Sequence, residues 1–199
     1  MDSTLIIVIA VVVVVGLVVV LYNGLVRARL RVDEAWSQIE VQLKRRWDLI
    51  PNLVNAVQGY MGFEQKVLTD VTTARASAVA AGAKGPHEAA MAENALSSTL
   101  RSLFAVVEAY PELKANENVL QLQEQLTTTE NQISFSRQHY NATVLDYNTR
   151  IATVPAVLIA GLLGFTKREF FDAEPAAEAT PVVNLGYPPA GGAGTPPSA

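Results

Sequence analysis

The chain has 199 residues, a formal net charge of −4 and a pI near 5.2, and it contains no cysteine. The lack of cysteine excludes disulfides, thiolate zinc sites and thiol nucleophiles. A nucleic-acid surface needs clustered cations that displace counterions, so the acidic balance argues against nucleic acid as a partner.

Residues Leu5 to Tyr22 form an uncharged apolar run, which predicts a transmembrane helix. A helix of this length spans roughly 27 Å, close to the ~30 Å hydrocarbon core of a bilayer. A cleaved signal peptide is the alternative, but no Lys or Arg precedes the run and no A-x-A-like site follows it. The residues that we place in the membrane include Leu5, Ile9, Val13, Gly16, Val20 and Tyr22.

The charges that flank this run predict its orientation. Arg27, Arg29 and Arg31 follow the run, whereas Asp2 is the one charged side chain before it. By the positive-inside rule, the arginine side faces the cytoplasm. We therefore expect a single-pass protein of the cell membrane, with residues 1–4 outside and the downstream domain in the cytoplasm.

Residues 23–154 change to a helical period, which predicts an all-α, antiparallel up-down bundle of about four helices, two long and two short. The first long helix follows a hinge-like Asn23-Gly24. Its coiled-coil-like seam repeats every seven residues, at Trp36, Leu43, Ile50 and Val57. Pro51 lies inside this helix and frees the carbonyl of Trp47, so we expect a kink or a short break there.

Two short helices are predicted next, over residues 63–81 and from Gly85-Pro86 to about residue 109. The second long helix begins near Asn116 or Asn118, with Asn118 and Gln121 as a capping box. Its apolar seam extends to Val154. The polar residues that interrupt this seam are Thr129, Glu130, Ser136 and Arg137.

Charged residues of the two long helices are candidates for an ion-pair network or a partner surface. They are Glu40, Arg45, Arg46, Asp48, Glu130 and Arg137. Because a buried charge needs a partner, an internal network is the favoured interpretation. With the helix ends aligned, Arg46 faces Glu130 and Glu40 faces Arg137, so we predict two partly buried ion pairs.

An apolar run follows Pro155, over residues 156–165, and it is too short to span a membrane. Residues 155–171 therefore either lie in the membrane interface or cap the bundle core. The interfacial residues would be Phe165, Lys167, Arg168, Phe170 and Phe171. Residues 172–199 hold six of the ten prolines and predict a disordered tail.

Several blocks of this sequence, in order, resemble the signature of the LemA family. They lie at residues 22–26, 35–39, 42–46, 48–54, 110–115, 129–133, 140–141, 147–148, 164–165 and 170–171. The similarity covers about residues 5–171, with small departures at Phe63 and Val119. It implies a bacterial, membrane-anchored α-helical bundle whose molecular activity is poorly defined, and it brings no catalytic motif.

The sequence carries no motif for catalysis or for a cofactor. Neither His87 nor His139 follows a glutamate at the Glu-x-x-His spacing of di-iron bundles, and no G-x-S-x-G, P-loop or H-E-x-x-H occurs. We interpret the chain as a non-enzymatic scaffold or interaction module without a cofactor. Expected partners are membrane lipid and other membrane or cytoplasmic proteins, with a homo-oligomer left open.

Two alternatives remain beside the scaffold. One is a self-assembling protein that organises or shapes the membrane by acting on lipid. The other, least favoured, is an enzyme with an unrecognised site.

Overall fold

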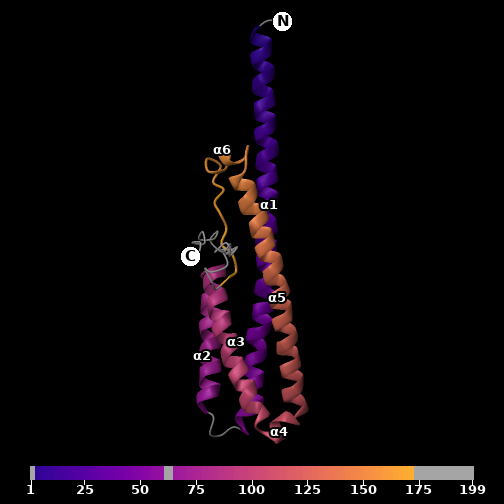
Figure 1. Cartoon of the computed structure of the whole chain (residues 1–199), viewed down its shortest axis with the longest axis vertical. Helices are drawn as coiled ribbons and strands as arrows, with labels where there is room; N and C mark the ends of the chain where they lie inside the picture. The colour runs from indigo at the N-terminus through magenta and orange to yellow at the C-terminus, as the bar shows by residue number, and fades with distance from the viewer. Residues whose placement is uncertain (1–2, 61–64, 173–199) are drawn as a thin grey trace, which may run out of the picture.

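The computed structural model describes residues 3–60 and 65–172, and all regular elements in this part of the chain are helices (Figure 1). They are α1 (Ser3–Gln58), α2 (Gln65–Gly82), α3 (Pro86–Glu108), α4 (Pro111–Lys114), α5 (Glu117–Ala152) and α6 (Val157–Ala160). The predicted all-α bundle behind an apolar N-terminal helix is confirmed. The predicted tail, beyond Asp172, lies outside the described residues.

Helix α1 carries both the apolar run and the first long helix of the bundle. By its length and composition, the apolar part of α1 can cross a membrane. None of this part is buried in the protein. The hinge expected at Asn23-Gly24 is wrong, because the helix continues through both residues. Leu25 and Ala28 are buried against the bundle directly after them, and this packing offsets the ~1 kcal/mol cost of a helical glycine.

Two further helix boundaries differ in detail from the sequence prediction. Asn116, not Asn118, caps α5, and its Oδ1 accepts hydrogen bonds from the amides of Asn118 and Val119 at 3.0 and 3.3 Å. At the other end α5 stops at Ala152, so Val154 leaves the seam and its side chain is 78% exposed. The turn α4 between α3 and α5 was not predicted.

The long helices α1 and α5 lie antiparallel (Figure 1), and contacts between their side chains fix the register. Arg31 reaches Asp146 at 3.4 Å, and the rings of Trp36 and Tyr140 lie 5.5 Å apart. The α2–α3 hairpin covers only the half of this pair that is distant from the N-terminus (Figure 1). Residues 165–172, which we call the strap, run along the other half.

The core is divided into two apolar clusters along the bundle axis. The membrane-end core joins α1 and α5 to the strap, to α6 and to the start of α3, with Ile39, Leu43 and Ile133 at its inner limit. The distal core joins α1 and α5 to α2, α3 and α4, and it begins at Ile50 and Leu126. The polar side chains described next lie between these two clusters.

Candidate functional site

Arg46 occupies a seam position of α1. Ile39 and Leu43 precede it and Ile50 and Leu53 follow it, all buried at the period of a bundle seam. The helix therefore directs the guanidinium into the bundle, where Arg46 is only 4% exposed. A buried guanidinium needs charged or polar partners.

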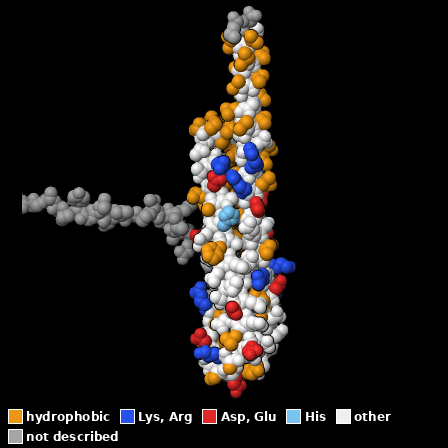
Figure 2. All heavy atoms as spheres, turned by 90° about the vertical axis from the view of Figure 1, so that its right-hand side faces the viewer, with side chains coloured by type: hydrophobic (Ala, Val, Ile, Leu, Met, Phe, Trp, Pro, Cys, Tyr) orange, Lys and Arg blue, Asp and Glu red, His pale blue; other side chains and the backbone are white. Residues whose placement is uncertain are grey.

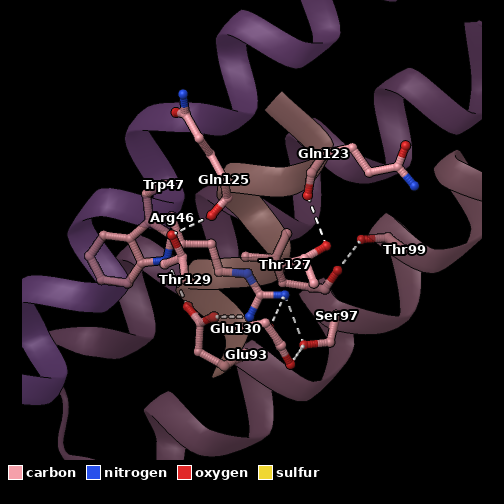
Figure 3. Close-up of polar contacts among 11 residues, drawn as sticks. Arg46, Trp47, Glu93, Ser97, Thr99, Gln123, Gln125, Thr127, Thr129 and Glu130 are labelled. Carbon is pink, nitrogen blue, oxygen red and sulfur yellow. Dashed lines mark hydrogen bonds and ion pairs between the residues drawn. The ribbon is translucent and has the colours of Figure 1, made fainter. Parts of the chain in front are cut away.

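Three side chains from two helices satisfy Arg46 (Figure 3). Its Nη1 lies 3.0 Å from Oε2 of Glu93, and its Nη2 lies 2.9 Å from Oε2 of Glu130. The same Nη2 donates to Oγ of Ser97 at 2.9 Å, and that hydroxyl donates to Oε1 of Glu130 at 3.3 Å. We call Arg46, Trp47, Glu93, Ser97 and Glu130 the Arg46 cluster.

Trp47 extends the cluster to α2. Its indole Nε1 donates to Oε1 of Glu93 at 2.6 Å, while Nε of Arg75 donates to the Trp47 carbonyl at 2.6 Å. A Cβ placed on Gly82 would lie 2.9 Å from the far edge of the Trp47 ring. Two adjacent residues of α1 thus contact α2, α3 and α5.

The charges in the cluster do not balance when both carboxylates are ionised. Burial raises the pKa of Glu93 above its ordinary value of 4.5, and this outweighs the opposing effects of Arg46 and of the Trp47 hydrogen bond. Ionised Glu130, which is 47% exposed, adds to the rise. A proton on Glu93 would leave one guanidinium paired with one carboxylate.

The cluster forms a polar layer between the two apolar cores. Trp47 packs against both cores, and the hydroxyl of buried Thr129 bonds back to the carbonyl of Gln125 at 2.8 Å. A polar layer inside a bundle penalises shifted registers, because a slip buries charges without their partners. This arrangement is suited to fixing the register of the packed helices. Among the described residues, no group of three or more His, Cys, Asp or Glu side chains could hold a metal ion.

A groove leads from the surface to the cluster, between α3 and α5. Its volume is about 240 Å³. Arg46, Ser97 and Glu130 line it together with Arg101, Phe104 and Asn131. The groove thus exposes a part of the cluster, including the Glu130 carboxylate, to a second molecule.

One of the two predicted ion pairs is present. Arg46 and Glu130 meet as the aligned register requires, but the pairing of Glu40 with Arg137 is wrong. Glu40 is exposed because it follows Ile39 on the outward side of the seam. Arg137 instead pairs with Asp172 at the end of the strap, at 2.7 Å. Register alone therefore predicted the level of these residues but not the direction of their side chains.

Other predicted residues lie on the outside of α1. Arg45 and Asp48 are exposed and line a shallow hollow of about 360 Å³. Pro51 lies inside an unbroken helix, so the alternative of a break is wrong. Arg27, Arg29 and Arg31 are exposed beyond the apolar run. Most side chains of the run are also exposed, among them Leu5, Ile9, Val13, Val20 and Tyr22.

The strap places its aromatic residues in the bundle, as the core-capping alternative expects. Phe165 and Phe171 are buried in the membrane-end core, and Phe170 packs against it. Arg168 pairs with Asp33 at 2.7 Å, while Lys167 is exposed. The three phenylalanines therefore cap the bundle core, whereas an interfacial position of Lys167 stays a prediction.

Two Tyr-Asn pairs, seven residues apart on α5, hold the strap. The hydroxyls of Tyr140 and Tyr147 donate to the carbonyls of Glu169 and Thr166 at 2.8 and 3.0 Å. Burial raises the pKa of both phenols, that of Tyr140 to about 12. Asn141 and Asn148 each bond both the amide and the carbonyl of one strap residue, Phe171 and Arg168 respectively.

Sequence reasoning missed Glu93 and Ser97. Glu93 lies on the same stripe as Leu96, Leu100 and Leu103, seven residues before Leu100, and a lone acid at that spacing in α3 was the available signal. It marks a buried charge that needs a cation from another helix.

A family model described as the LemA family matches residues 35–185 of this chain. The chain belongs to the LemA family. The match starts after the apolar run and includes the Arg46 cluster and the strap. This LemA-family chain is also similar to magnetosome proteins and to a protein that itself carries the LemA name.

Magnetosome protein MamQ 2 of Paramagnetospirillum magneticum is 26% identical over 186 residues, which cover 81% of this LemA-family chain and 68% of the relative. Magnetosome protein MamQ of Magnetospirillum gryphiswaldense is 25% identical over 186 residues, which again cover 81% of this chain and 68% of the relative. Protein LemA of Metamycoplasma hominis is 27% identical over 133 residues, or 66% of this chain and 59% of the relative.

Proposed function

We propose that this LemA-family protein is a non-enzymatic, single-pass membrane protein whose bundle serves as a scaffold or interaction module at the bacterial cell membrane. The observation that carries the proposal is the continuity of α1. One helix of 56 residues, roughly 84 Å at 1.5 Å per residue, runs from the apolar segment to the distal end of the bundle. It would hold the bundle at a set orientation to the bilayer.

The cations near the apolar segment support a cytoplasmic bundle. Arg27, Arg29 and Arg31 on α1 are joined at this level by Arg150 at the end of α5 and by Lys167 and Arg168 of the strap. Figure 2 shows Lys and Arg side chains gathered below the apolar upper part of the molecule. Cations adjacent to a span favour the cytoplasmic side.

Protease accessibility tests this orientation. Protease added to intact cells should leave a C-terminal tag whole, and the tag should be digested once the cells are opened. Digestion of the tag in intact cells would show that the bundle lies outside the cytoplasm.

The α3–α5 groove is the surface that we assign to a protein partner. A photo-reactive amino acid at Thr127, in the groove, should form adducts with another protein in membranes, whereas the same probe at Asp70 on the exposed side of α2 should not. Equal labelling at both positions would contradict a specific partner in the groove.

A second candidate is a self-assembling protein that organises the membrane. Val41 and Phe135 favour it, because they are 63% and 72% exposed and lie at one level of the α1–α5 pair, between the Trp36–Tyr140 and Arg46–Glu130 contacts. A second copy could cover them. Large homomeric particles of the detergent-solubilised chain would support this candidate, whereas a monomer or a small complex with other proteins would support the scaffold.

A further inference from the structure

The chain between α5 and the strap forms a compact turn with an apolar outer face. We call residues 153–164 the α6 loop. Its inner side chains, Ala156 and Ala160, are buried in the membrane-end core. Its outer side chains are apolar and exposed, with Val154, Leu158 and Leu162 at 78%, 72% and 88%. No charged residue occurs between Arg150 and Lys167.

The α6 loop lies beside the end of the apolar run. Val154, Pro155 and Ala156 share a hollow of about 200 Å³ with Val20 and Leu21 of α1. The ring of Tyr22 contacts that of Phe165, directly after the loop, edge-on at 5.8 Å. Figure 1 places α6 beside α1 at the membrane end of the bundle, and Figure 2 shows apolar side chains on the surface at this level.

Many backbone groups of the loop bond internally, and internal bonding is the main requirement for backbone that enters lipid. The amides of Val157 and Ala160 donate to the carbonyls of Thr153 and Ala156 at 2.9 and 2.8 Å. Near the end of the loop, the amides of Leu163 and Phe165 donate to carbonyls within it at 3.0 Å.

We propose that the α6 loop inserts its outer face into the bilayer leaflet that borders the bundle, beside the transmembrane part of α1. The position of the loop favours lipid as the occupant, since any surface level with Val20 and Leu21 borders the membrane that holds them. Arg150 and Lys167 flank the loop, and their side chains can reach the headgroups while the loop lies deeper.

The insertion gives the bundle two attachments to one bilayer. A single transmembrane helix can rotate about its axis and tilt, whereas a second contact at the end of α5 restricts both movements. The inference goes beyond the proposed interaction role, because it holds whether or not the bundle binds a partner.

The absence of native cysteine allows a direct test with the full-length chain in vesicles of phosphatidylcholine and phosphatidylglycerol. A fluorophore sensitive to polarity is attached to Leu158→Cys or Leu162→Cys, and quenching is measured with lipids that carry a nitroxide on the acyl chain. Leu145→Cys and Phe135→Cys on α5 are the controls, because they are also exposed and apolar.

The proposal predicts blue-shifted emission and loss of most fluorescence at Leu158 and Leu162, with neither effect at Leu145 or Phe135. Equal behaviour at all four positions would overturn it. A disulfide between two chains at Leu162→Cys without lipid quenching would also overturn it, since a second copy would then cover the loop.

A charge placed on the outer face gives a second readout. Leu158→Glu, in the chain labelled at Leu162→Cys, should expel the loop and abolish the lipid quenching. Leu145→Glu in the same chain should leave the quenching unchanged. If Leu158→Glu also leaves it unchanged, the outer face does not hold the loop in lipid.

Discussion

Arg75 of α2 donates its Nε hydrogen bond to the backbone carbonyl of Trp47, the carbonyl that Pro51 leaves without a helical partner. A proline inside a helix costs about 3 kcal/mol, in part because this carbonyl loses its hydrogen bond. Here a side chain from the neighbouring helix supplies the donor at 2.6 Å. The proline thus leaves a carbonyl that Arg75 of α2 binds. This hydrogen bond offsets part of the cost of keeping Pro51 inside α1.

This relationship predicts coupling between Arg75 and Pro51. Arg75→Met should destabilise the protein by about 1–3 kcal/mol, because it leaves a partly buried carbonyl unsatisfied. In a Pro51→Ala chain the same change should cost much less, since the alanine restores a backbone N–H that can donate to the Trp47 carbonyl. Denaturant unfolding of the four chains in mild detergent measures the coupling, and an equal cost in both backgrounds would contradict it.

Two glycines of the helices should respond in opposite directions to alanine. Gly82→Ala should destabilise the protein, although alanine is the better helix former, because its Cβ would lie 2.9 Å from a Trp47 ring held by Glu93. Gly24→Ala is the matched control. Apart from its chain neighbours and the adjacent helix backbone, no atom lies within 4 Å of its Cβ position, so it should stabilise α1 by about 0.5–1 kcal/mol. Melting temperatures of the two variants provide the test. If both variants are more stable than the native chain, the close approach of Gly82 to the Trp47 ring is contradicted.

The partners of Arg46 should contribute unequally to stability. Arg46→Met should cost about 3 kcal/mol, because it leaves Glu93 buried without its cation. Double-mutant cycles should give a large coupling energy with Glu93→Met and less than about 1 kcal/mol with Glu130→Leu, since Glu130 is 47% exposed. A larger coupling energy with Glu130 than with Glu93 would contradict this order, and would show that the carboxylate at the groove stabilises Arg46 more.

The raised pKa of Glu93 predicts a pH-dependent difference between the native chain and Glu93→Gln. The folded state binds the Glu93 proton more tightly than the unfolded state, so this residue contributes stability at low pH and loses it as pH rises through the folded pKa. The stability of the native chain minus that of Glu93→Gln should therefore increase as pH falls toward 4.5, the ordinary value. Thermal unfolding of both chains across this range provides the test. A difference that decreases would mean that Arg46 stabilises the carboxylate more than burial penalises it.

Patterns of regular period predicted most of the fold. The Trp36, Leu43 and Ile50 repeat indicated the seam of α1, and the alignment of the two long helices placed Arg46 opposite Glu130. Helix direction and level follow from apolar spacing, because each helix must bury one face.

Other features depend on contacts that no local pattern encodes. The strap is held by tyrosine hydroxyls and asparagine amides that bond to its backbone, so its own sequence does not show whether it faces lipid or protein. The continuity of α1 depends on the packing of Leu25 and Ala28 after a sequence that favours a turn. The contact of Arg75 with Trp47 joins two helices, so no local sequence pattern predicts it either.

One rigid helix joins the membrane segment to the bundle, and the proposed scaffold depends on this feature more than on any other. Spin labels at Val12→Cys and Leu30→Cys test it most directly in the full-length chain in vesicles. Both positions are exposed, and their spacing of eighteen residues equals five helical turns. Pulsed electron paramagnetic resonance on chains diluted with unlabelled protein should give one narrow distance distribution near roughly 27 Å between the labelled backbone positions. A broad distribution, or a shorter mean distance, would show a bend at Asn23-Gly24 and contradict the account.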